Sequence, residues 1–164
     1  LPVAILYPGS VLGPGDAKSS GRYVDDIVHR RLPMAVFSDD VLTWVHVRDV
    51  ADAIARLLGR DDAAGARYVI GRHRLTLHQI NEVIQDVSGV RPPRLEMPDW
   101  MARLSARVLT GLSTVIGRPP VWGLSTDVAR TVSHSIQADG SRAERELGLQ
   151  YTDIRTAVAD TIGA

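Results

Sequence analysis

Residues 1–7 form an apolar run with Val and Ile at its centre. A run that is apolar at every position is typical of a strand buried on both faces of a parallel sheet. Pro and Gly then crowd into residues 8–15. Because proline cannot donate to a strand ladder, we predict that the strand ends there in a loop. Open α/β sheets bind ligands at such strand ends, so the loop is a candidate ligand site, with a plain strand-to-helix connection as the alternative.

Short β-prone runs and apolar positions at helical spacing follow one another along the rest of the chain. The pattern predicts strands over residues 34–37, 41–47, 67–71 and 95–97. It predicts helices over residues 21–32, 48–58, 77–88, 98–116, 127–133, from 139 or 141 to 148, and 153–162.

Local signals set the ends of several helices. Thr76 and Gln79 have the spacing of a capping box, Gly59 and Gly89 follow two helices as stops, and Thr152 is the expected cap of the last helix. The apolar residues of helix 48–58 are expected to turn inward, among them Ile54, Leu57 and Leu58.

Strands alternate with helices only in the first half of the chain, and the second half is mostly helical. We therefore predict an α/β fold, the C-terminal part of a doubly wound Rossmann-type sheet plus a mostly helical substrate-binding lobe. A sheet of two or three strands is thin for an independent domain, and the chain has no initiator methionine. We expect residues 1–164 to be a piece of a larger protein.

Composition excludes several classes of function. The 19 basic and 19 acidic residues balance, which argues against nucleic-acid binding. No apolar run reaches the ~20 residues of a membrane span and no signal-peptide pattern is present, so we expect a cytoplasmic protein without membrane partners. The chain has no Cys, and its five His show no pair at ligand spacing, so we predict no metal site.

The first loop matches neither of two glycine-rich signatures of phosphate-binding loops. The lysine of a phosphate loop would be Lys18, but Ala17 stands where the preceding glycine is required and Asp16 would repel a phosphate. Position 18 also lacks the third glycine of the dinucleotide-binding fingerprint. His46, within a buried strand pattern, is interpreted as a hydrogen-bonded core histidine, and Asp49 as a helix-start residue.

Four motifs, in this order and spacing, carry a resemblance: residues 2–16, 44–54, 68–71 and 141–148. Together they resemble the C-terminal half of an extended short-chain dehydrogenase/reductase. The nearest subgroup is the dihydroflavonol-4-reductase-like branch of the NAD-dependent epimerase/dehydratase superfamily. The similarity extends over essentially the whole chain.

The resemblance implies a parent enzyme that binds NADP or NAD through a glycine-rich loop and moves a proton with a Tyr-x-x-x-Lys pair. Neither feature occurs here, because the four tyrosines are followed at the Lys position by Val11, Ile27, Arg72 and Arg155. We therefore assign no catalytic residue and expect the isolated chain to be inactive and to bind no cofactor.

The resemblance also implies two sets of site residues. The nicotinamide end of the cofactor would lie against Pro8, Gly9, Ser10 and Val11, mainly at backbone groups. The substrate would contact Gly13, Ser20, Tyr23, Ile27 and Trp122. For Tyr23 and Ile27, the core face of an ordinary helix remains an alternative of equal weight.

One departure from the family bears on the substrate. Nucleotide-sugar members of the superfamily carry an Arg-Asp pair where this chain has Leu42 and Thr43. Without the Arg a pyrophosphate loses a bidentate partner, which favours a small, rather hydrophobic ketone, aldehyde or alcohol. A nucleotide-sugar epimerase or dehydratase, and a redox-silent NAD(P) sensor, stay open as alternatives.

The expected partners are a small-molecule substrate and the missing N-terminal Rossmann half, and a homo-oligomer is left open. Separated from that half, the strand over residues 2–7 is expected to lose its partners and to be disordered, re-paired or buried in an oligomer.

Overall fold

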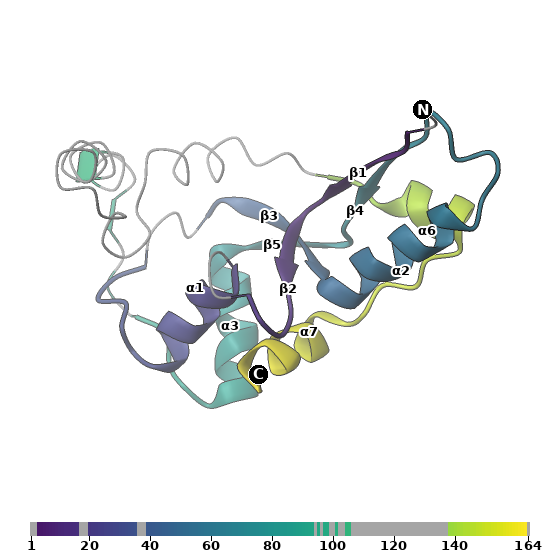
Figure 1. The fold of residues 1–164 in the computed structure, drawn as a ribbon. Coiled ribbons are helices and arrows are strands. Elements are labelled where there is room, and N and C mark those ends of the chain that lie inside the picture. Colours follow the sequence, from purple (N-terminus) through teal and green to yellow (C-terminus); the bar gives the residue numbers. More distant parts are fainter. Residues whose placement is uncertain are drawn as a thin grey trace, which may run out of the picture.

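The computed structural model describes residues 3–16, 20–35, 39–93, 95, 97–98, 101, 104–105 and 138–163. Two small sheets are accompanied by two groups of helices (Figure 1). All the described strands lie before residue 77, and the last two described elements are helices, as the α/β prediction requires. No helix of this part is long and apolar enough to cross a membrane.

The two sheets share the chain's first extended segment. In one sheet β1 (Ile5–Pro8) pairs in parallel with β4 (Arg67–Ile70). In the other, β2 (Ser10–Leu12) pairs in parallel with β3 (Val41–His46), which pairs antiparallel with β5 (His73–Thr76). Consecutive residues thus change partner from β4 to β3, with Gly9 between the two strands.

The helices cover the sheets in two groups (Figure 1). The first group is α1 (Ser20–Val28), α3 (Leu77–Ser88) and α7 (Ile154–Ile162), which pack with β2 and β3 around Trp44. The second group is α2 (Val47–Leu58) and α6 (Ser141–Leu147), which pack with β4 around Ile70. Each group closes its own hydrophobic cluster.

The predicted helix signals of α3 are confirmed. The Thr76 Oγ1 accepts from the Gln79 N–H at 3.1 Å, and the Thr76 N–H donates to the Gln79 Oε1 at 2.9 Å. Gly89 follows with a φ of 72°, the left-handed conformation that glycine adopts most easily. Gly59 likewise follows α2, where its N–H donates to the carbonyl of Ala55.

The first strand ends at Pro8, as predicted, but the expected loop comes later, because the chain resumes as β2 to Leu12 and turns only from Gly13. The N–H groups of Ile5 and Gly9 both donate toward the β4 side, at 2.9 Å each. Backbone groups of a strand alternate in direction, so the position of Pro8 faces the opposite edge and its missing N–H costs no ladder bond.

Several element boundaries also differ from the prediction. The sequence pattern missed β5 altogether, and the last helix is capped by the Asp153 side chain instead of Thr152. Helix α1 ends at Val28, four residues early, where Arg30 adopts a positive φ of 55°. The strand over 34–37 is reduced, within the described residues, to a bridge at Ala35, whose backbone pairs with Leu95 and Met97.

The inward orientation predicted for α2 is correct for Leu57, which is 7% exposed, and wrong for Ile54 and Leu58. Those two side chains are 46% and 84% exposed. The predicted helix over 127–133 and most of the one over 98–116 lie outside the described residues.

Candidate functional site

The predicted cofactor-contacting residues lie where the two sheets meet. Pro8 ends β1, Gly9 joins the strands, and Ser10 and Val11 pair in register with Trp44 and Val45. Pro8 is exposed and the other three are half-buried. The structure therefore presents the four predicted residues as one extended stretch of backbone.

Gly9 is required at this junction by the close approach of β3. A Cβ on Gly9 would lie 2.3 Å from the carbonyl oxygen of Thr43, a distance that real Cβ atoms do not adopt. The Gly9 N–H meanwhile donates to the Ile70 carbonyl at 2.9 Å. The segment is held from β4 and β3 together, so its position is fixed by backbone contacts.

A group of polar contacts behind Gly9 was missed by the sequence reasoning. The Thr43 Oγ1 accepts from the Ala138 N–H at 3.1 Å. The Tyr151 hydroxyl accepts from the Gly71 N–H and donates to the Gly140 carbonyl, both at 3.2 Å. Burial raises the pKa of Tyr151, which keeps its hydroxyl protonated for both bonds. The available signal was a threonine flanked by apolar residues in β3.

The predicted substrate-contacting residues begin just beyond β2. Gly13 is buried and has a φ of 148°, and a Cβ there would lie 2.4 Å from the Cγ1 of Val47. Ser20, half-buried, is the first residue of α1. The Asp16 Oδ2 accepts from the Gly21 N–H at 2.8 Å, which ties this loop to the helix start.

Tyr23 and Ile27 both make structural contacts on α1. The Tyr23 hydroxyl donates to the Asn81 Oδ1 on α3 at 2.9 Å, and burial raises the pKa of Tyr23 to about 12. Ile27 is 1% exposed within the cluster shared with α3 and α7. Their roles toward a substrate stay predictions, and Trp122 lies outside the described residues.

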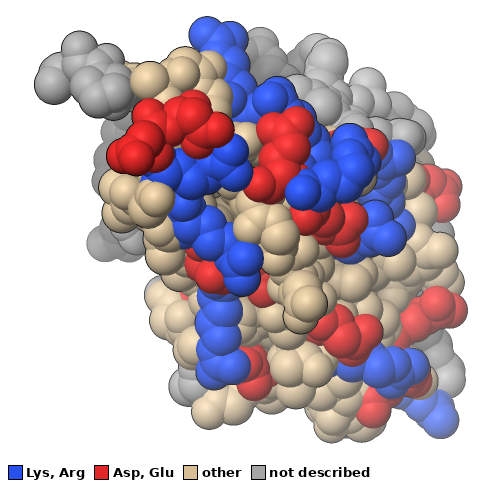
Figure 2. Space-filling view, turned by 90° about the vertical axis from the view of Figure 1, so that its right-hand side faces the viewer, with Lys and Arg blue, Asp and Glu red and all other residues tan. Residues whose placement is uncertain are grey.

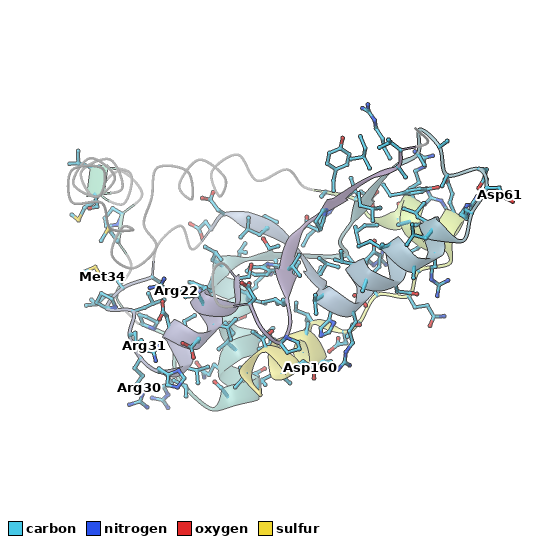
Figure 3. The ribbon with its side chains drawn as sticks, viewed as in Figure 1. Arg22, Arg30, Arg31, Met34, Asp61 and Asp160 are labelled. Carbon is cyan, nitrogen blue, oxygen red and sulfur yellow. The ribbon has the colours of Figure 1, made fainter. Side chains whose placement is uncertain are left out.

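His46 is a hydrogen-bonded core histidine, as interpreted from the sequence. It is 1% exposed and caps α2, since its Nδ1 accepts from the Arg48 N–H at 3.0 Å. Its Nε2 lies 3.4 Å from the Oδ2 of Asp160, which Figure 3 shows on α7. The histidine therefore holds a helix start and is itself closed to solvent.

Asp49 does more than begin a helix. Its carboxylate is 4% exposed and accepts two hydrogen bonds from Thr152, one from the N–H at 3.0 Å and one from the hydroxyl at 2.6 Å. The residue therefore fixes the segment that leads into α7 against α2.

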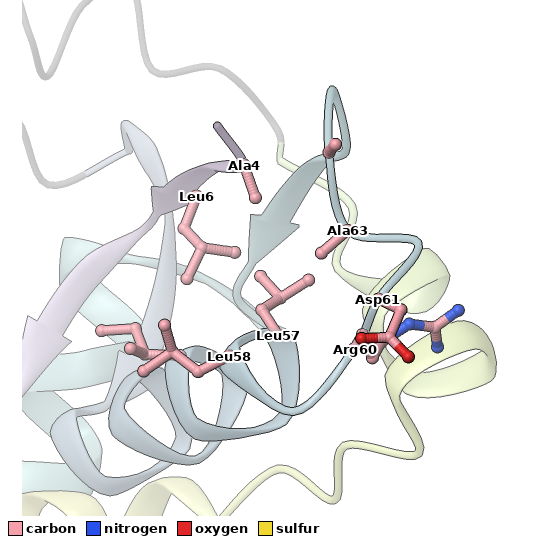
Figure 4. Close-up of a pocket in the computed structure, with 9 residues that line it drawn as sticks. Ala4, Leu6, Leu57, Leu58, Arg60, Asp61 and Ala63 are labelled. Atoms are coloured by element: carbon pink, nitrogen blue, oxygen red, sulfur yellow. The ribbon is translucent and has the colours of Figure 1, made fainter. Parts of the chain in front are cut away.

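A separate hollow of about 570 Å³ lies between β1 and α2, and we call it the α2 groove (Figure 4). Its lining residues are Ala4, Leu6, Ile54, Leu57, Leu58, Arg60, Asp61, Ala63 and Ala64. None of the predicted site residues is among them. Figure 3 shows the separation, since Asp61 of the groove lies far from Arg22 of α1.

Charged side chains show no site of their own in the described part of the chain. No group of three or more His, Asp or Glu is placed there to hold a metal ion. On the face shown in Figure 2, basic and acidic side chains lie beside one another. The structure also pairs Arg56 with Asp52 at 2.8 Å and Arg142 with Glu146 at 2.9 Å.

No protein-family profile matches the chain. Two curated proteins do. One, from Synechocystis sp., is named as a candidate dihydroflavonol 4-reductase and is 27% identical over 98% of the chain and 47% of its own length. The other, sterol demethylase protein B of Methylococcus capsulatus, is 29% identical over 99% of the chain and 49% of its own length. The chain thus spans about half the length of the curated relatives it matches.

Solved structures share the fold. The crystal structure of gox2253 has a TM-score of 0.71 and 27% identity over 98% of this chain and 48% of its own. A UDP-glucuronic acid 4-epimerase from Bacillus cereus, solved with UDP-glucuronic acid and NAD, has a TM-score of 0.61 at 16% identity, over 99% of this chain and 45% of its own. At that identity the second likeness shows the fold alone.

These comparisons confirm the resemblance read from the motifs. The homologues are dihydroflavonol-4-reductase-like and NAD-dependent epimerase/dehydratase proteins, and the chain corresponds to their C-terminal portion. The α/β fold class is confirmed as well, since the structural neighbours are Rossmann-type proteins.

Proposed function

We propose that the chain is the substrate-binding portion of an NAD(P)-dependent oxidoreductase. Its parent would reduce a carbonyl or oxidise an alcohol on a small, rather hydrophobic substrate. The family of the homologues supports the coarser class of NAD(P)-dependent oxidoreductase or epimerase-like protein.

The environment of Thr43 is the observation that favours a neutral substrate over a nucleotide sugar. Thr43 is 4% exposed, and its hydroxyl is engaged with the backbone of Ala138. Leu42 beside it packs against the cluster around Trp44. Neither side chain offers a charged, exposed group to a diphosphate, which supports a neutral substrate over a nucleotide sugar.

The stretch from Pro8 to Val11 has the form expected of a cofactor-contacting wall. It is extended backbone, held at Gly9 by Ile70 and Thr43, so a planar ring would meet a rigid surface. A bound nicotinamide supplies or accepts the hydride. Since the chain has no Tyr-x-x-x-Lys pair, the matching proton would be handled by residues of the other half.

The test is an assay of the intact parent protein with NADPH and NADH against a panel of neutral ketones and aldehydes, and against UDP-sugars. We expect loss of NAD(P)H absorbance with at least one carbonyl compound, none with the UDP-sugars, and no activity of the isolated chain. Epimerisation of a UDP-sugar would contradict the proposal in favour of an epimerase. NAD(P)H binding without turnover would contradict it in favour of a sensor.

A further inference from the structure

Two buried glycines lie behind Gly9 and leave as little room for a side chain as Gly9 does. Gly71 follows β4 and Gly140 precedes α6, and these two elements lie side by side (Figure 1). A Cβ on Gly71 would lie 2.7 Å from the Cγ2 of Thr43 and 3.8 Å from the Gly9 nitrogen. A Cβ on Gly140 would overlap the carbonyl oxygen of Gly71, to which the Gly140 N–H donates at 3.1 Å. We call Gly9, Gly71 and Gly140 the glycine stack.

The Tyr151 hydroxyl bonds to two members of the glycine stack. It accepts from the Gly71 N–H and donates to the Gly140 carbonyl, both at 3.2 Å. A phenylalanine ring would fill the same space, so the hydroxyl contributes a link between two backbone segments and little packing. The tyrosine is itself held in place, because the next residue, Thr152, donates twice to the buried carboxylate of Asp49.

A displacement of Gly71 reaches Gly9 through a single peptide unit. Gly71 follows Ile70, whose carbonyl accepts from the Gly9 N–H at 2.9 Å. The Thr43 methyl group lies against Gly71 from the side of β3 and limits its movement in that direction. The position of Gly9 therefore depends on the bond that Tyr151 makes to Gly71.

We propose that Tyr151 is a positioning residue for hydride transfer, because it sets where the stretch from Pro8 to Val11, the cofactor wall, meets the nicotinamide ring. This inference rests on the proposed function. In a reduction, a hydrogen with two electrons moves from the dihydronicotinamide to the carbonyl carbon, and the carbonyl oxygen takes a proton supplied by the other half, which leaves NAD(P)⁺ and an alcohol. Misplacement of reacting groups by about 1 Å can slow such a step on the order of 100-fold. A wall of backbone cannot correct a displacement by rotating a side chain, so its support decides the distance.

Tyr151→Phe in the intact parent tests the proposal, assayed by single-turnover stopped-flow with a carbonyl compound that the parent reduces. The amplitude of the NAD(P)H absorbance change counts the active sites, and the rate constant reports the transfer itself. We expect the rate constant to fall roughly tenfold or more while the amplitude is retained. A merely structural role would lower the amplitude alone. A rate constant within about twofold of the wild type would overturn the proposal.

Tyr68→Phe is the matched control. Tyr68 is 4% exposed, and its hydroxyl donates to the Glu146 Oε2 at 2.8 Å, which lies outside the glycine stack. The change removes the same atom from the same type of side chain and should leave the rate constant unchanged. An equal fall of the rate constant in both variants would refute the proposal, since it would show a general effect of losing a tyrosine hydroxyl.

Hydrogen exchange of the intact parent, labelled at glycine and followed by NMR, separates this inference from the proposed function. We expect the Gly9 amide to exchange faster in Tyr151→Phe than in Tyr68→Phe, because its acceptor at Ile70 is less firmly held. A wild-type parent that neither binds nor oxidises NAD(P)H would refute the proposed function, and faster Gly9 exchange would still support the link from Tyr151 to the cofactor wall. Equal Gly9 exchange in the two variants would refute that link.

Discussion

Gly9 connects β1 to β2 because only a hydrogen fits against the Thr43 carbonyl. A Cβ at this position would approach that oxygen to 2.3 Å, and both partners are backbone within sheets, so neither can yield by a change of rotamer. The residue therefore decides where the chain changes from one sheet to the other.

Gly9→Ala is expected to lower the free energy of unfolding by about 1–3 kcal/mol, the usual cost of forcing an extra methyl into a packed site. Urea denaturation followed by circular dichroism measures it. Gly59→Ala is the matched control, since Gly59 has a φ of −84° and a Cβ there would meet no atom closer than 3.7 Å. Equal stability of Gly9→Ala and the wild type would show that the Thr43 carbonyl leaves room for a methyl group at position 9.

Tyr23 links stability to pH. Burial raises its pKa from 10.0 to about 12, so the unfolded chain ionises first as the pH rises. The stabilisation from the neutral phenol is complete below pH 10 and is lost as the pH rises from about 10 to about 12.

Tyr23→Phe should therefore flatten the fall in unfolding free energy above about pH 10. At neutral pH the same variant is expected to cost about 1 kcal/mol, because the buried Asn81 Oδ1 loses its donor. Denaturation at a series of pH values measures both. Tyr7→Phe, at a 48% exposed tyrosine, should keep the wild-type slope, and an unchanged slope in Tyr23→Phe would refute the assignment.

At the scale of elements, α3 shows how far local signals extend. Its start is fixed by the reciprocal bonds of Thr76 and Gln79, and its end by the left-handed Gly89. Helix α2, by contrast, begins at a buried histidine, whose capping role depends on the fold that buries it. The first kind of boundary is readable from sequence and the second is not.

Thr76→Ala is expected to destabilise the protein by about 1 kcal/mol, the ordinary cost of losing an N-cap oxygen. Thr76→Ser keeps that oxygen and should stay within about 0.5 kcal/mol of the wild type. Thermal or urea denaturation of these two variants separates the contribution of the hydroxyl to stability from that of the methyl group. A Thr76→Ser variant as unstable as Thr76→Ala would show that packing of β5, and not the cap, dominates.

At the scale of the whole molecule, the two hydrophobic clusters are joined near the C-terminal end of the described chain. Thr152 donates twice to Asp49, and its carbonyl lies 2.8 Å from the Nε2 of His73. These contacts hold the segment before α7 to α2 and to β5, so the described part of the chain has a defined internal arrangement.

That arrangement supplies one wall of the proposed cofactor site and no phosphate-binding loop. Isothermal titration of the isolated chain with NADPH, and separately with NADH, is therefore expected to give no measurable binding, while the intact parent binds one of them. Micromolar affinity of the isolated chain would contradict the proposal that cofactor binding belongs to another part of the parent protein.

The sequence by itself determined the features that depend on near neighbours and on order along the chain. The capping box of α3, the stops at Gly59 and Gly89 and the ordered motifs of the resemblance are of this kind. The assignment of Pro8 to Val11 as cofactor-contacting residues also came from the sequence and stays a prediction, whereas their extended form is seen only in the structure.

Only the tertiary structure decided which side of each element has a partner. Pro8 is tolerated in a strand because its nitrogen faces an edge that β4 does not use. Ile54 and Leu58 are exposed because, among the described residues, the hollow between α2 and β1 is left unfilled on their side of the helix. The Thr43 hydroxyl accepts a hydrogen bond from the backbone of Ala138, a residue 95 positions away. Such pairings join residues that are distant along the chain, so no local pattern of apolar and polar positions records them.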